Sequence, residues 1–187
     1  MAIKIFIDQG HNPENPNAGA EGNGYREQDL VYYIGEELNT LLNENPDFEA
    51  MLSRNTPDEI LGMSVASSLR ERVNAANEWG ADYFISLHAN ASDIPTASGS
   101  EAFVYSSSSA ALPLVENILI GLHDATGLEN RGVSSRPTLY VLRATDMPAT
   151  LIELGFITNA EDAALMANNP RLFAQGIYNG ILMFFGM

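Results

Sequence analysis

The sequence contains no cysteine. Disulfide bonds, thiol nucleophiles and cysteine-bound zinc are therefore excluded, and any metal must be held by His, Asp or Glu side chains. Histidine is also scarce, because the 187 residues include only His11, His88 and His123. A metal site that uses histidine must draw on these three side chains.

Basic residues are few as well, with nine Lys and Arg against 24 Asp and Glu, and the formal net charge is −15. A field of this sign repels phosphate backbones and anionic lipid, so we expect neither a nucleic-acid partner nor a membrane-surface partner. The chain lacks an apolar run close to the roughly 20 residues of a membrane-spanning helix. The N-terminal letters MAIKIF lack the segments of a signal peptide, so none is expected.

Apolar residues make up 45% of the chain, enough for a sizeable core, and the length favours one domain, residues 1–187. Hydrophobic spacing predicts helices over residues 27–43, 65–79 and 111–126, and a last helix from Pro170 to about residue 184. Asn159 is expected to cap a short helix, with Asp162 completing a capping box. Strands are expected over residues 3–8, 48–53, 83–87, 102–105, 139–142 and 149–154.

This alternation of strands and helices is typical of βαβ units. We therefore predict the α/β class: a single domain with a mostly parallel twisted sheet of about six strands and helices on both faces. In open sheets of this kind, ligands bind beyond the carboxyl ends of the strands. His11 and His88 follow the predicted strands over residues 3–8 and 83–87, and Glu153 follows residues 149–152 near the end of the last strand, so their side chains should emerge at the same edge of the sheet.

Two histidines at one sheet edge supply half of a zinc site, and two His with one Glu is a known catalytic ligand set. Glu27 is the best third ligand, because it begins the first long helix just after the loop that follows His11. Considered one at a time, His11 and His88 could also serve in a turn or in packing. Glu27 alone could be a solvated acid in the first turn of a helix. His123, near a helix C-terminus, is interpreted as structural.

Glu153 stands inside the apolar stretch TLIELGF. A carboxylate in such a strand is costly unless it is paired, so a structural ion pair and a functional role are equal alternatives. In the functional alternative, Glu153 is the general base that takes a proton from water and passes it to a leaving amine. The residues alone lead as far as zinc-assisted hydrolysis of an amide.

Five ordered motifs then resemble one family. They are IFIDQGH at 5–11, GNGYREQDL at 22–30, LRERVNAANEWGADYFISLHANA at 69–91, GSEAFVY at 99–105 and RGVSSRPTLYVLRATDMPATLIELGFITNAED at 131–162. Together they resemble the zinc-dependent N-acetylmuramoyl-L-alanine amidases of the amidase family 3 type, found in bacterial cell-wall hydrolases and phage endolysins. The chain departs from many members at Asn12-Pro13, where they have glycine, and this difference concerns the rim of the cleft.

The resemblance implies zinc held by His11, Glu27 and His88, with Glu153 catalytic. It also implies the reaction, which is hydrolysis of the amide between the lactyl group of N-acetylmuramic acid and L-alanine of the peptidoglycan stem peptide. Two rival functions stay open: a non-catalytic peptidoglycan-binding module, and a zinc peptidase that acts on other peptides.

Three further residues are candidates for substrate binding. Arg131 and Arg143 are two of only nine cations, and both fall in the last motif, where they would meet carboxylates of the stem peptide. A surface ion-pair role is an equal alternative for both. Asn90 lies two residues after His88 in the central motif.

The expected place of action is the bacterial cell wall. Without a signal peptide, three routes fit: release as a phage lysin, a role inside a mother cell or spore, or excision from a longer chain. Because a net charge of −15 does not attract the chain to an anionic wall, a separate wall-anchoring domain outside these residues is also expected.

Overall fold

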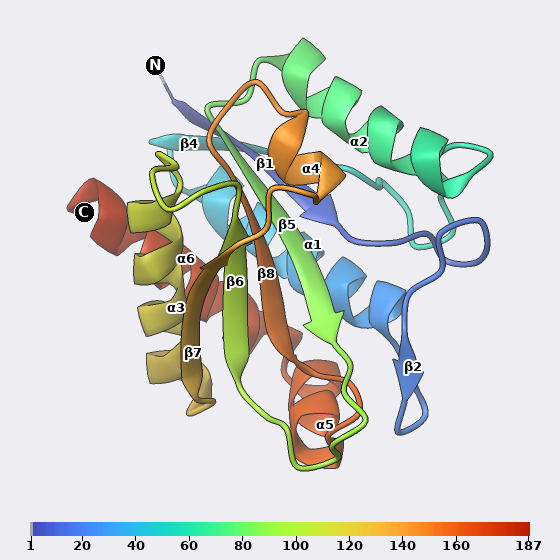
Figure 1. Cartoon of the computed structure of the whole chain (residues 1–187). Helices are drawn as coiled ribbons and strands as arrows, with labels where there is room; N and C mark the ends of the chain where they lie inside the picture. Colours follow the sequence, from blue (N-terminus) through green and yellow to red (C-terminus); the bar gives the residue numbers. More distant parts are fainter. Residues whose placement is uncertain (1) are drawn as a thin grey trace.

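The computed structural model describes residues 2–187 and contains a six-stranded sheet with the strand order β4-β1-β5-β8-β6-β7 (Figure 1). Neighbouring strands are parallel except β6 and β8, which are antiparallel. A separate two-stranded hairpin joins β2 and β3. The strands are β1 (Ile3–Gln9), β2 (Glu21–Gly22), β3 (Tyr25–Arg26), β4 (Phe48–Leu52), β5 (Tyr83–Asn90), β6 (Ser100–Val104), β7 (Asn130–Ser135) and β8 (Ala149–Phe156).

Helices cover both faces of the sheet, as the sequence predicts. They are α1 (Glu27–Glu44), α2 (Val65–Trp79), α3 (Leu112–Thr126), α4 (Tyr140–Arg143), α5 (Ala160–Asn168) and α6 (Pro170–Phe185). Apolar residues of α1, α3 and α6 form one core against the sheet, and those of α2 and α4 form a second core on the opposite face. In Figure 1 the α2 and α4 face is toward the viewer. The predicted α/β class and mostly parallel sheet are confirmed.

Local signals explain where several helices begin and end. A capping box between Ser64 and Ser67 starts α2, and Gly80 ends it with a left-handed φ of 69°. Asn159 caps α5 by accepting hydrogen bonds from the backbone of the first turn. The predicted capping box with Asp162 is wrong, because the Asp162 carboxylate instead accepts hydrogen bonds from the Ser98 hydroxyl and from the backbone N–H of Gly99 and Phe156.

Two predictions about the sheet need correction. Residues 139–142 form no strand, because Tyr140–Arg143 is the single helical turn α4, whose Val141 and Leu142 are buried against the sheet. A four-residue apolar run has the same appearance in a short buried helix and in a strand. The sixth strand of the sheet is β7, which the sequence hid because its letters, NRGVSS, are mostly polar. An edge strand tolerates such a composition.

Two strands also run further than predicted. β5 continues to Asn90 and β8 to Phe156, so His88 lies inside its strand rather than after it, and Glu153 lies three residues before the end of β8. Both residues still lie near the carboxyl ends of their strands. Within residues 2–187, none of the helices has the length and apolar character needed to cross a membrane.

Candidate active site

A row of polar side chains crosses the sheet near the carboxyl ends of β5 and β8. His88 is paired in register with Glu153, and Glu153 is paired with Glu101 on the antiparallel strand β6. Residues in register on neighbouring strands point to the same face. Two residues before His88 and Glu153 on their strands, Ser86 and Leu151 lie on this same face, which α2 and α4 cover.

Gly10 brings the end of β1 against this row. Its backbone N–H donates to the Leu87 carbonyl at 3.0 Å, directly beside His88. A methyl group at Gly10 would lie 2.6 Å from both Cε1 and Nε2 of the His88 ring. Glycine is therefore required for the next residue, His11, to approach His88, and the two imidazole rings lie 4.8 Å apart edge to face.

Glu27 reaches both histidines from the first turn of α1. Its Oε1 lies 3.0 Å from Nδ1 of His88 and 3.2 Å from Nε2 of His11. The backbone also holds this carboxylate, because Ala89 N–H donates to Oε1 and Ala20 N–H donates to Oε2. The predicted convergence of the strand-end histidines with a helix-start glutamate is therefore present in the structure.

The ionisation of this cluster follows from its contacts. Burial by itself would raise the pKa of Glu27, but hydrogen bonds from His11 and His88 hold it well below its usual range. Burial opposes the charged form of His88, and the neighbouring Glu27 carboxylate outweighs it and raises the pKa of His88. In the metal-free protein, Glu27 therefore stays an anion that can accept a cation.

The donor set fits a zinc ion. Ligand atoms of His11, Glu27 and His88 all lie within 4.8 Å of one another. Two donors of a tetrahedral zinc site are about 3.3 Å apart, given zinc–ligand bonds near 2.0–2.1 Å, and the two His–Glu separations of 3.0 and 3.2 Å are close to this spacing. Nδ1 of His11 is buried and has no hydrogen-bond partner among the described residues.

Glu153 is the acid next to this cluster. Its Oε2 is buried without a hydrogen-bond partner in the part of the chain that the structure describes, so no ion pair of the kind considered for it is seen there. Burial raises the pKa of Glu153 to about 7, His88 opposes the rise, and the charges of Glu27 and Glu101 add to it. A carboxyl group with this pKa exchanges protons readily at neutral pH.

The loop after His11 is held in place by Asn12. The Asn12 side chain is fully buried. Its amide nitrogen donates to the carbonyls of Pro16 and Leu61 at 2.7 and 3.0 Å, and its oxygen accepts from Leu61 N–H at 3.2 Å. Asn12 therefore fastens this loop to the segment between β4 and α2.

The remaining candidate residues lie near this row of polar side chains but are not part of the cluster of His11, Glu27 and His88. Asn90 donates to Glu101 at 2.5 Å, which places it beside Glu153. Arg131, at the start of β7, is exposed and stacks over Phe156. Arg143 is exposed and stacks over Tyr140 in α4. His123 bonds the Leu128 carbonyl at the end of α3.

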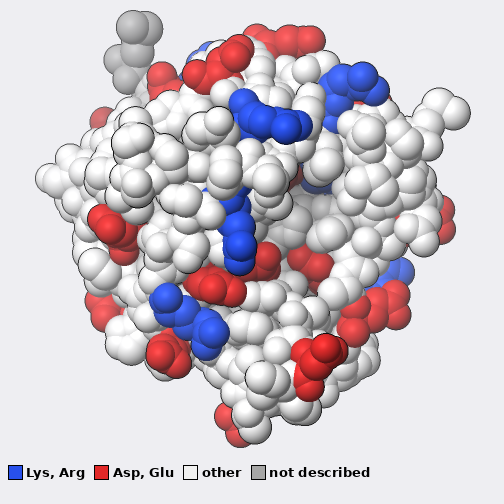
Figure 2. Space-filling view, in the orientation of Figure 1, with Lys and Arg blue, Asp and Glu red and all other residues white. Residues whose placement is uncertain are grey.

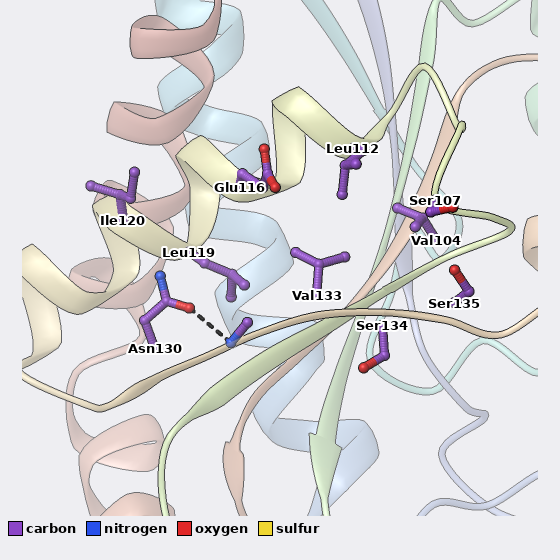
Figure 3. Close-up of a pocket in the computed structure, with 11 residues that line it drawn as sticks. Val104, Ser107, Leu112, Glu116, Leu119, Ile120, Asn130, Val133, Ser134 and Ser135 are labelled. Atoms are coloured by element: carbon purple, nitrogen blue, oxygen red, sulfur yellow. Dashed lines mark hydrogen bonds between the residues drawn. The ribbon is translucent and has the colours of Figure 1, made fainter.

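A cavity of about 110 Å³ adjoins the cluster and is lined by His11, His88 and Tyr140 among others. Figure 2 shows a hollow near the middle of this face, with acidic side chains at its floor and basic side chains beside it. A separate cavity of about 360 Å³ lies between α3 and β7 (Figure 3). Glu116 is the only titratable side chain among its lining residues, so this second cavity offers no comparable chemistry.

Sequence reasoning missed several supporting residues. Asp8 and Arg72 form a buried ion pair beneath the site, and Glu101 adjoins Glu153. Two signals were available: Asp8 is an acid in an apolar strand, and Arg72 falls on the apolar face of its helix, three residues after Leu69. The position of Glu101 depends on the antiparallel pairing of β6 with β8, which no local pattern indicates.

Comparisons with known proteins identify a family for the chain. A family model described as N-acetylmuramoyl-L-alanine amidase matches residues 5–183. The N-acetylmuramoyl-L-alanine amidase CwlM of Bacillus licheniformis is 35% identical over 192 residues, which cover 99% of this chain and 70% of that protein. An endolysin of Bacillus phage SPP1 is 32% identical over 190 residues, which cover 97% of this chain and 65% of the endolysin.

A solved structure gives the same result at the level of the fold. The catalytic domain of CwlV, an N-acetylmuramoyl-L-alanine amidase from Bacillus (Paenibacillus) polymyxa var. colistinus, superposes with a TM-score of 0.84. It is 30% identical, and the match covers 98% of both chains. The chain therefore belongs to the N-acetylmuramoyl-L-alanine amidase family.

Proposed function

We propose that this chain is the zinc-dependent catalytic domain, residues 1–187, of a peptidoglycan amidase. It hydrolyses the amide between the lactyl group of N-acetylmuramic acid and L-alanine of the stem peptide. The observation that carries the proposal is the convergence of His11, Glu27 and His88 beside Glu153. Membership of the amidase family supports the choice of bond.

In this proposal His11, Glu27 and His88 would be the three protein ligands that hold zinc. Bound zinc supplies Lewis acidity, which polarises a carbonyl and lowers the pKa of water. Backbone N–H groups of Ala20 and Ala89 hold the Glu27 carboxylate in place for this task. Gly10 keeps the two imidazoles close to each other.

Glu153 is the proposed general base and acid. Its Oε2, which has no partner among the described residues, accepts a proton from the attacking water and returns it to the departing alanine nitrogen. The raised pKa of about 7 in the metal-free protein suits transfer in both directions near neutral pH. A nearby dication lowers that pKa and favours the base form at the start of the reaction.

Arg131 and Arg143 are proposed to contact carboxylates of the stem peptide, since both guanidinium groups are exposed on elements that border the site. Asn90 is proposed to act on substrate through Glu101. The Asn90 amide already donates a hydrogen bond to Glu101 and accepts one from Ala91 N–H. Because both ends of the amide are occupied, Asn90 is better suited to orient the Glu101 carboxylate than to contact the substrate directly.

The proposed place of action is the bacterial cell wall, where the substrate lies. The endolysin of phage SPP1 and the amidase CwlM are both relatives, so release as a lysin and action by a bacterial enzyme both fit. Wall affinity is proposed to come from a separate anchoring domain, because the net charge of −15 does not supply it.

Digestion of purified cell walls by the zinc-loaded protein tests the proposed reaction. New N-terminal alanine without new reducing sugar is the expected result. Other new amino termini would identify a peptidase instead, and sedimentation with the walls without either product would identify a binding module.

A further inference from the structure

Arg72 of α2 places a guanidinium group inside the protein, directly under the turn that carries His11. The side chain is 1% exposed. Its Nη1 donates to the Asp8 carboxylate at 2.7 Å and to the Gln9 carbonyl at 2.5 Å. Its Nη2 donates to the His11 carbonyl and to the Asn12 side-chain oxygen. One guanidinium thus contacts the chain before, at and after His11.

His11 needs such a constraint because its backbone is in the left-handed region, with a φ of 66°. Residues other than glycine adopt this region at a cost, and they persist there only when surrounding contacts fix them. Because φ sets the direction of a side chain relative to the residues before it, an extended backbone at His11 would change the direction of the imidazole. The hydrogen bond to the His11 carbonyl acts at the same residue that has the unusual φ.

The guanidinium is itself anchored to β1, which leads into His11, and to β5, which carries His88. The second oxygen of Asp8 accepts a hydrogen bond from the Ser86 hydroxyl at 2.7 Å. Ser86 stands two residues before His88 on β5, and Asp8 stands three residues before His11 on β1. Burial would raise the pKa of Asp8, but Arg72 and Ser86 lower it, so the pair stays charged.

We propose that Arg72 is the positioning residue of the metal site: its guanidinium, anchored by Asp8, fixes the left-handed turn at His11 so that the imidazole faces Glu27 and His88. This inference rests on the proposed zinc site. Arg72 touches neither the donor atoms nor substrate, so it acts on zinc through His11.

Arg72→Lys is the variant that tests this role most directly. An ammonium keeps the positive charge but lacks the planar fork that contacts Asp8 and the His11 carbonyl together. Loss of a hydrogen bond that orients a metal ligand, made by a residue that does not itself bind the metal, commonly weakens metal affinity by about 10- to 100-fold. We expect a loss of this size in zinc affinity, measured by competition with a chelator in the full chain.

A double-mutant cycle separates positioning from general destabilisation. If Arg72 acts through His11, Arg72→Lys should cause almost no further loss of zinc affinity in a His11→Gln background. Asp162→Asn is the matched control. It disrupts another buried side chain that accepts three hydrogen bonds, and this side chain contacts no proposed zinc ligand. It should lower thermal stability and leave zinc affinity unchanged.

Asp8→Asn provides a second variant, since loss of a buried guanidinium can prevent folding. Its neutral amide holds Arg72 less firmly, so zinc affinity should fall in the wild-type background and not in His11→Gln. A loss of equal size in both backgrounds would overturn the inference for either variant. Wild-type zinc affinity in Arg72→Lys would overturn it as well, whereas a wild-type chain that binds no zinc would overturn the proposed function itself.

Discussion

The ionisation of Glu153 links the site to folding. Its pKa is about 7 in the folded, metal-free protein, compared with 4.5 for an ordinary glutamate. Folding therefore favours the protonated carboxyl. The stability that this preference contributes is fully present below pH 4.5 and is lost as the pH rises through about 7.

Replacement by glutamine should remove this dependence. In chelator-treated protein, Glu153→Gln should become more stable relative to wild type as the pH rises from about 4.5 to 8, by about 1–3 kcal/mol in the free energy of unfolding. Urea unfolding at several pH values measures the difference. Glu116→Gln, at an exposed position, is the control, and a difference between wild type and Glu153→Gln that does not change with pH would contradict the assignment.

For single residues, the sequence indicated those whose polarity differs from that of their neighbours along the chain. His11, His88 and Glu153 were recognisable because polar groups end or interrupt apolar strands, and Glu27 because it starts the next helix. The left-handed φ of His11 and the hydrogen bonds of Arg72 around it were not predictable, since both depend on contacts between residues about 60 positions apart.

Among the elements, long periodic helices were predicted with accurate ends, as for α2, which was expected over residues 65–79 and begins and ends there. Short or polar elements were not. α4 is one turn long and owes its conformation to burial of Val141 and Leu142, and β7 is held by its pairing with β6. Tertiary contacts rather than local preference determine such segments.

The contact between α3 and α6 depends on glycine. A methyl group at Gly180 would overlap the backbone of Ile118 and Asn117. Gly180→Ala should therefore destabilise the protein by about 1–3 kcal/mol, although alanine alone favours a helix by about 1 kcal/mol. The midpoint of urea unfolding reports the change.

Asn179→Ala, on the exposed side of the same helix, is the control for Gly180→Ala. It should leave the midpoint near that of wild type. If Gly180→Ala is as stable as this control, the close packing of α3 on α6 is not what holds the two helices together.

For the whole molecule, the net charge of −15 should oppose the approach of the proposed amidase to an anionic wall. Repulsion extends about 30 Å at 0.01 M salt and about 8 Å at 0.15 M. Hydrolysis of purified walls should therefore speed up as salt rises over this range. Walls stripped of their anionic polymers are the control and should show little salt dependence, while a rate that falls with added salt would indicate attraction instead.

The central claim is that Glu153 carries the proton in hydrolysis while His11, Glu27 and His88 hold zinc. The most direct measurement is the rate at which zinc-loaded Glu153→Gln releases new N-terminal alanine from purified walls, with the zinc content of the same sample determined. The account predicts bound zinc at the wild-type level and a rate lower by about 10²- to 10⁴-fold. A zinc-loaded variant that works at the wild-type rate would contradict it.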